Sequence, residues 1–212
     1  MSIPVISLCG VDGVGKTSIL QALTQKEELR EIYFVGRGPA DAESTIEKYY
    51  PRSGAISDWL EGDFNRAIAT GCAIDYVAYY HAVVAPLLTG KDNSGRRYRA
   101  IVCDRHTPCF NAFTLINDAP SQHALALLSS VPDPDCIINV TLDRMHIKKR
   151  HGEAFGADYE FESDTCQDRL FQAYEKVFEA GDSPVYTIQN DGPLEVTTSK
   201  IAKLIHEVAH ER

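Results

Sequence analysis

Short apolar runs alternate with longer amphipathic stretches along the whole chain. The runs predict buried strands, because roughly four to eight consecutive β-branched or other apolar residues suit a strand covered on both faces. They lie at 3–8, 32–35, 100–103, 135–141 and 185–188. Apolar positions spaced by three and four predict helices over about 17–30, 57–88 and 121–130, and from Pro193 to Val208.

This order of elements predicts the fold class. Alternating strands and helices indicate an α/β fold of three layers, α/β/α, with a central parallel sheet. Within the helix at about 57–88, Gly62 and Gly71 are candidate breaks. A length of 212 residues fits a single domain, which we assign to 1–212.

Charge limits the classes of partner. The chain has 21 Lys and Arg against 30 Asp and Glu, a net charge of −9, which disfavours general binding to nucleic acid. An anionic ligand therefore requires a local cluster of positive groups. No apolar run is long enough to span a bilayer and the start does not resemble a signal peptide, so we expect no membrane association.

The cysteines form no C-x-x-C pair, and three of them lie in or beside apolar runs, where a free thiol behaves as a small hydrophobic group. The six are Cys9, Cys72, Cys103, Cys109, Cys136 and Cys166. Reduced thiols are the simplest interpretation, and they indicate a cytoplasmic protein.

One segment carries a specific chemical signal. Gly10-Val11-Asp12-Gly13-Val14-Gly15-Lys16-Thr17 matches G-x-x-x-x-G-K-[ST] between a predicted strand and a predicted helix. Glycines let the main-chain N–H groups turn toward phosphate oxygens, the lysine reaches the β- and γ-phosphates, and the threonine hydroxyl binds Mg²⁺. The alternative interpretation is a glycine-rich turn with a surface lysine, which does not require a strand before it and a helix after it. The residues predicted to contact ATP here are Gly10, Asp12, Gly13, Val14, Gly15, Lys16, Thr17 and Ser18.

This loop resembles that of thymidylate kinases, which carry an acidic residue at the position of Asp12. Asp104-Arg105-His106 resembles the D-R-[YH] motif of the same family, and the similarity continues to the C-terminal region. The other positions that resemble the family are Cys109, Ala112-Phe113, Lys148-Lys149-Arg150, Glu160 to Ser163, Arg169, Tyr174 and Ile188 to Gly192.

The resemblance implies a P-loop NTPase fold with a helical lid at about 144–163, in a homodimeric enzyme that uses ATP and Mg²⁺ to phosphorylate a nucleoside monophosphate. It places Asp12 at the acceptor sugar and Lys16 at the transferred phosphate. Arg37 and Arg105 would bind the acceptor phosphate, and Asp104 would lie near the metal with Thr17. The remaining implied contacts are Lys149 and Arg150 from the lid and Asn190 on the adenine side.

Several positions depart from the family pattern. The family's Arg-Glu-Pro-Gly segment is Gly36-Arg37-Gly38-Pro39 here, and Tyr76 stands where a thymine-contacting arginine is expected. A pocket built to hydrogen-bond one base rejects others, so losing those groups indicates an acceptor other than strictly thymidylate. The polar loop at 91–99 is an insertion, either a part of the new pocket or a solvated surface loop. The remaining predicted acceptor contacts are Cys72, Cys109, Phe113 and Thr114.

Two types of acceptor, a phosphate and a hydroxyl, remain possible, and they require different chemistry. A monophosphate is largely ionised at neutral pH and needs no base, whereas a hydroxyl of a nucleoside or other small molecule needs a nearby carboxylate. Arg37 follows the second strand where related nucleoside kinases have a glutamate, which favours a phosphate, although Asp12 or Asp41 remains a candidate base. A nucleotide-binding switch is the alternative that is not an enzyme.

One further motif suggests a different function. His206-Glu207-Val208-Ala209-His210 matches H-E-x-x-H of zinc proteases. Catalytic zinc needs a third protein ligand, and this motif supplies only its two histidines. We therefore interpret both histidines as surface residues of a helix.

Overall fold

Five parallel strands form the centre of the structure, a computed structural model, in the order β2-β3-β1-β4-β5. The structure describes residues 2–36, 64–92, 94–116, 120–147 and 164–210. The strands are β1 Val5–Cys9, β2 Ile32–Val35, β3 Ala100–Asp104, β4 Cys136–Thr141 and β5 Val185–Gln189. All five predicted strands are confirmed, although β1 begins two residues later than expected, directly after a proline that has no N–H to donate.

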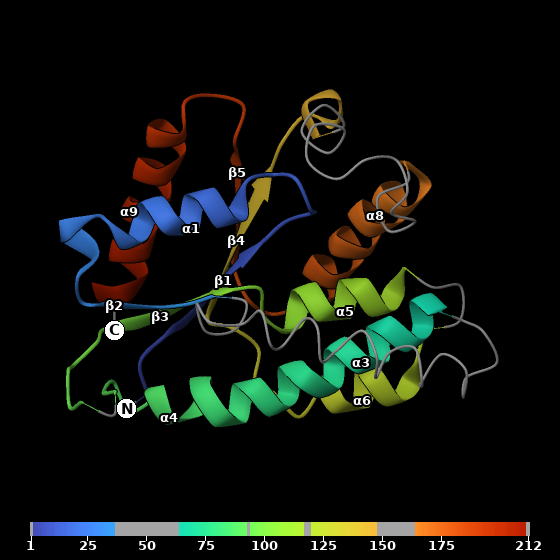
Figure 1. Ribbon diagram of the computed structural model, residues 1–212, viewed down its shortest axis with the longest axis horizontal. Helices are drawn as coiled ribbons and strands as arrows, with labels where there is room; N and C mark the ends of the chain where they lie inside the picture. Colours follow the sequence, from blue (N-terminus) through green and yellow to red (C-terminus); the bar gives the residue numbers. More distant parts are fainter. Residues whose placement is uncertain (1, 37–63, 93, 117–119, 148–163, 211–212) are drawn as a thin grey trace.

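Helices cover both faces of this sheet (Figure 1). They are α1 Lys16–Thr24, the 3₁₀ helix η1 Glu27–Leu29, α3 Phe64–Tyr79, the π-helical turn η2 Tyr80–Val84, α4 Ala85–Leu87, α5 Thr107–Leu115, α6 Gln122–Leu128, α8 Asp164–Ala180 and α9 Leu194–His210. In Figure 1, α1 and α9 lie on one side of the strands and α3 and α6 on the other. This arrangement confirms the predicted α/β/α fold with a parallel sheet.

The alternation of side chains along the strands divides the core in two. In β3, Ala100 and Val102 belong to a core cluster with the apolar faces of α1, α8 and α9, while Ile101 and Cys103 belong to a second cluster with α3 and α6. Strands covered on both faces in a parallel sheet consist mainly of apolar residues, as β1 to β4 do here, whereas β5 is partly exposed. The apolar runs of the sequence are the consequence.

Two helix predictions require correction. The helix expected over about 17–30 ends at Thr24, and Lys26 is extended before η1 begins. Glu27 and Glu28 are unfavourable at the C-terminal end of a helix dipole and favourable at the start of η1, which explains the break. The candidate break at Gly71 is wrong, because α3 continues through it to Tyr79.

The irregularity of that long helix lies further along. The π-turn η2 directly precedes Pro86 in α4. A proline ring clashes with the carbonyl four residues before it in a regular helix, and a wider turn accommodates it. The predicted start of this helix, including Gly62, lies outside the described residues, as does most of the predicted lid.

The polar loop at 91–99 lies at the amino-terminal edge of the sheet. The Arg99 main-chain N–H donates to the Glu31 carbonyl at 2.8 Å, and the Arg99 side chain pairs with the Glu31 carboxylate at 2.5 Å. Loops that follow the carboxyl ends of parallel strands lie at the opposite edge. The described part of the 91–99 segment is therefore a surface loop away from the glycine-rich segment at 10–17. No helix among the described residues has both the length and the apolar character needed to cross a bilayer.

Candidate active site

The segment between β1 and α1 forms a tight phosphate loop. Gly10 has φ 136°, and a Cβ atom there would lie 2.3 Å from the main-chain oxygen of Val140, so only glycine fits. Gly15, with φ 93°, is the N-cap of α1, so the chain turns sharply into that helix. Thr17 and Ser18 are exposed in the first turn, which contains no acidic residue. This helix N-terminus therefore suits an anion.

Side chains from distant elements hold the phosphate loop in place. Asn190, after β5, donates from Nδ2 to the Val14 carbonyl at 2.7 Å, and Thr197 of α9 donates to Asn190 Oδ1 at 2.9 Å. Tyr174 of α8 donates from its hydroxyl to the Gly10 carbonyl at 3.3 Å. Asn190, predicted to lie on the adenine side, is buried and positions the loop through these contacts.

Lys16 lies folded against the loop. Its Nζ donates to the carbonyls of Gly10 at 2.8 Å and Val11 at 2.7 Å, and lies 3.8 Å from Asp12 Oδ1. Burial, together with the nearby charge of Arg105, lowers the pKa of Lys16 to about 8, while Asp12 opposes that shift. The side chain remains largely charged at neutral pH.

Arg105 approaches the phosphate loop from the end of β3. It is 3% exposed and has φ 72°, the left-handed region that L-residues other than glycine rarely adopt. Its guanidinium donates to Asp12 Oδ1 and lies 4.8 Å from the centre of the Phe113 ring. Burial lowers the pKa of Arg105, but the charges of Asp12, Tyr174, Cys109 and Asp104 together outweigh burial and raise it. Nε and Nη1 have no hydrogen-bond partner among the described residues.

Asp104, the last residue of β3, is the second carboxylate of the site. Its Oδ1 is buried and has no hydrogen-bond partner within the part of the chain that the structure describes. A buried carboxylate oxygen is costly unless a cation or donor meets it. Asp104 and the exposed hydroxyl of Thr17 are hard oxygen ligands of the kind Mg²⁺ prefers.

An aromatic cluster lies beside this site. The Tyr76 ring of α3 stacks on Phe110 at 4.3 Å between centroids and meets His106 edge-on at 5.6 Å. Burial lowers the pKa of His106 to about 3, so the imidazole is neutral, and burial raises the pKa of Tyr76. Thr114 is fully buried, and its hydroxyl donates to the Phe110 carbonyl at 2.9 Å within α5.

Two predicted acceptor contacts differ in accessibility. Cys72 on α3 is half-buried, whereas Cys109 on α5 is fully buried with its Sγ 3.0 Å from Cys9 Sγ. The predicted residues Arg37, Asp41, Lys149 and Arg150 lie outside the described residues. The structure therefore brings together the loop, Arg105, Asp104 and part of the predicted acceptor side, and leaves the other cations as predictions.

The pattern of the sequence missed three neighbours of the site. Cys9 and Phe110 are apolar side chains packed in or against the core, and they give no polar signal in the sequence. Tyr174 follows the lid in the family resemblance, and its apolar spacing with Leu170 predicts only core packing. Their contribution depends on contacts between distant segments, which no local pattern contains.

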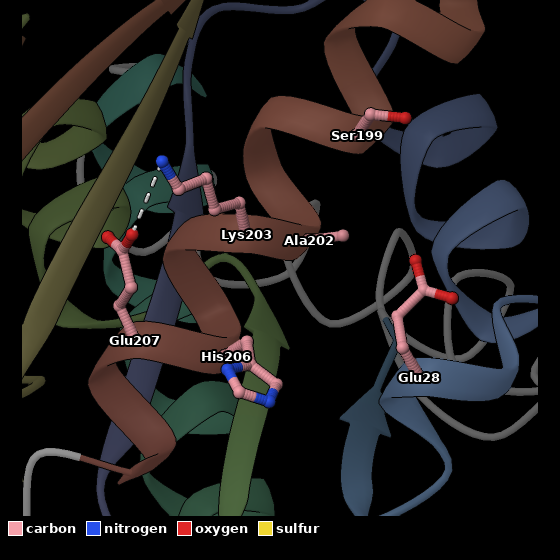
Figure 2. Close-up of a pocket in the computed structure, with 6 residues that line it drawn as sticks. All are labelled: Glu28, Ser199, Ala202, Lys203, His206 and Glu207. Carbon is pink, nitrogen blue, oxygen red and sulfur yellow. Dashed lines mark ion pairs between the residues drawn. The ribbon is translucent and has the colours of Figure 1, made fainter.

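Two hollows on the described surface lie beside α9 and η1, away from the phosphate loop. A cavity of about 330 Å³ separates α9 from the segment around η1, and His206 also borders an adjoining one of about 600 Å³. Figure 2 shows Glu28 across the first cavity from α9, with Lys203 and Glu207 paired at 3.7 Å. The H-E-x-x-H histidines stack on each other at 4.0 Å, and no group of three metal-ligating side chains occurs in the described residues. The first cavity is lined by Glu28, Ser199, Ala202, Lys203, His206 and Glu207.

Comparison with known proteins supports the fold. The sequence matches no protein-family model and no curated protein. Among solved structures, it is similar to thymidylate kinase from Candida albicans, whose structure reveals the origin of that enzyme's broad substrate specificity. The TM-score is 0.67 at 18% identity, over 99% of this chain and 94% of that one. The chain thus has the P-loop NTPase fold of thymidylate kinase.

Proposed function

We propose that this chain transfers the γ-phosphoryl group of ATP to a phosphorylated, nucleotide-like acceptor, with Mg²⁺. One observation carries the proposal: the buried guanidinium of Arg105 lies beside the phosphate loop, bonded to Asp12, with two nitrogens unpartnered among the described residues. Transfer between two anionic substrates requires cations at both, because their phosphates must approach each other.

The donor side consists of the loop and Lys16. Main-chain N–H groups at the start of α1 bind ATP phosphates, and Lys16 neutralises charge on them. The contacts from Asn190 and Tyr174 keep the loop carbonyls oriented. Thr17 and Asp104 fit Mg²⁺, which when bound neutralises charge on phosphate oxygens. From the sequence, Lys149 and Arg150 are the candidates for cations that follow the transferred charge.

The site favours a phosphate over a hydroxyl as acceptor. A hydroxyl needs a carboxylate that takes its proton. Asp12 is bonded to Arg105 and lies 3.8 Å from Lys16 Nζ, so its carboxylate is already engaged by two cations. A monophosphate needs no base, and the unpartnered nitrogens of Arg105 suit its oxygens. Arg37 is the further phosphate ligand that the sequence indicates.

We also propose that the acceptor is not strictly thymidylate. Tyr76 stands where the resemblance expects an arginine, and it is buried against Phe110. Two buried polar atoms of this region have no hydrogen-bond partner among the described residues. They are the Tyr76 hydroxyl oxygen and, nearby, His106 Nε2. A base that forms hydrogen bonds with this hydroxyl and this imidazole nitrogen needs donors and acceptors at different positions from a base that an arginine binds.

A coupled ADP-release screen over nucleoside monophosphates, nucleosides and small phosphorylated metabolites tests the proposal. We expect a phosphorylated acceptor to accelerate ATP turnover, and Lys16→Ala to reduce that turnover by orders of magnitude while circular dichroism shows an intact fold. Acceleration by nucleosides alone would replace the acceptor assignment with a hydroxyl. Slow turnover that no acceptor changes would identify a nucleotide-dependent switch.

We further propose a homodimer acting in the cytoplasm. The dimer rests on the family resemblance, and the location on the interpretation of the cysteines, five of which are free thiols in the described residues. Light scattering coupled to size-exclusion chromatography measures the mass in solution. A mass of one chain across the concentrations used in the assay would contradict the dimer.

A further inference from the structure

Two thiols meet directly beneath the phosphate loop. Cys9, the last residue of β1, immediately precedes Gly10, and Cys109 lies in the first turn of α5. Both side chains are fully buried, and their Sγ atoms are 3.0 Å apart although 100 positions separate them in the chain. A disulfide has sulfurs about 2.0 Å apart, so an approach of about 1 Å separates this contact from a bond.

The surroundings favour the thiolate form of one of the pair. Burial opposes ionisation of Cys109, but the hydrogen bond with Cys9, the charge of Arg105 and the hydrogen bonds with Tyr174 and the His106 main chain together outweigh burial and lower the pKa of Cys109 to about 6. Burial raises the pKa of Cys9, which keeps the proton. Elsewhere, burial raises the pKa of Cys103 to about 12 and that of Cys136 to about 11. A thiolate beside a protonated thiol is the arrangement from which a disulfide forms.

We propose that Cys9 and Cys109 form a reversible disulfide when the protein meets a peroxide, and that this bond impairs the phosphate site. Cys109 sulfur attacks hydrogen peroxide, the O–O bond breaks, and a sulfenic acid forms as hydroxide leaves and takes a proton to become water. Cys9 sulfur then displaces the hydroxyl group, which leaves with the Cys9 proton as a second water. Two thiols and one peroxide give one disulfide and two waters.

The bond would act on the loop through its neighbours. The Gly10 carbonyl, next to Cys9, accepts hydrogen bonds from both Lys16 and Tyr174. Cys109, in the first turn of α5, is four residues after Arg105 in the sequence. Drawing the two sulfurs together shifts the start of the loop relative to α5, so the hydrogen bonds around Gly10 lose their geometry. Small displacements at phosphate sites have large effects, because the contacts depend on alignment.

Peroxide titration of the purified full-length protein tests the pairing without reference to any acceptor. We expect intact mass to fall by two hydrogen atoms, and non-reducing peptide mapping to join the peptides that contain Cys9 and Cys109. The affinity for a fluorescent ATP analogue should fall about tenfold, as for one charged hydrogen bond lost, and a dithiol reductant should restore it.

Cysteine variants test whether the disulfide forms between Cys9 and Cys109 or through other cysteines. Cys9→Ser and Cys109→Ser should each abolish the crosslink and the peroxide sensitivity, measured against the same variant before treatment. Cys136→Ser, which removes another buried thiol, should crosslink as the wild type does. Two separate variants allow the test to proceed if one fails to fold. A crosslink through other cysteines, no crosslink, or full crosslinking with unchanged affinity would overturn the proposal.

Discussion

Arg105 combines an unfavourable backbone conformation with a buried charge, and two substitutions separate these properties. Its φ of 72° costs a residue with a Cβ about 1–2 kcal/mol relative to glycine. Arg105→Ala removes the guanidinium and keeps this strain, whereas Arg105→Gly removes both. Glycine also gains about 0.5–1 kcal/mol of freedom in the unfolded chain. We therefore expect Arg105→Gly to be more stable than Arg105→Ala by about 1 kcal/mol.

The same two variants should lose function equally. Both lack the charged hydrogen bond to Asp12 and the nitrogens available to an acceptor phosphate. Hydrogen bonds to charged groups contribute about 1.5–3 kcal/mol each, so kcat/KM for the acceptor should fall about 10²-fold. The KM for ATP should change far less, because Lys16 and the loop are intact.

Urea unfolding compares the stabilities, and steady-state kinetics with the acceptor from the screen compares the functions. Equal stability of the glycine and alanine variants would refute the argument from backbone strain. An equal loss for ATP and for the acceptor would refute the assignment of Arg105 to the acceptor phosphate. The two results are independent, since one depends on the main chain and the other on the side chain.

Three further predictions concern the phosphate loop. Lys16 has a pKa near 8, so above pH 8 its side chain must take up a proton before it can bind phosphates as a cation. The affinity for a fluorescent ATP analogue should therefore weaken above pH 8, by up to about tenfold per pH unit. Lys16→Met should give a flat profile, and an equally flat wild-type profile would contradict the shift. Gly10→Ala places a Cβ against a main-chain oxygen and should lower the free energy of unfolding by at least about 2 kcal/mol in urea, whereas Gly192→Ala, in open space, should have little effect. Asn190→Ala leaves the buried Val14 carbonyl unpaired and should cost about 1–3 kcal/mol by thermal unfolding; unchanged stability would show that Asn190 does not hold the loop.

The sheet and the loop were predictable because their signals are local. Strands covered on both faces consist mainly of apolar residues, so β1 to β4 are visible as short apolar runs with few polar residues. The phosphate loop needs glycine, lysine and threonine at fixed spacing, because backbone geometry and side-chain reach allow few alternatives. Even Ser121, the observed N-cap of α6, lies at the predicted start of its helix.

Helix α5 and the contacts around the loop were not predictable in this way. α5 packs against α3, α6 and α8, so apolar residues lie around most of its surface and no single apolar face is evident in the sequence. The Asp12–Arg105 and Cys9–Cys109 contacts join segments about a hundred residues apart. Such pairs depend on strand order, and the order β2-β3-β1-β4-β5 is a property of the whole chain.

The charges of the described site explain why its remaining cations matter. Lys16 and Arg105 are balanced by Asp12 and Asp104, so these four side chains together carry no net charge. ATP and a monophosphate bring several negative charges, and the oriented N–H groups of the loop offset only a part of them. Mg²⁺ and the sequence-predicted cations Arg37, Lys149 and Arg150 supply the rest in our proposal. Because the whole chain carries −9, the proposed binding of a polyanion depends on these local positive groups and not on the general surface.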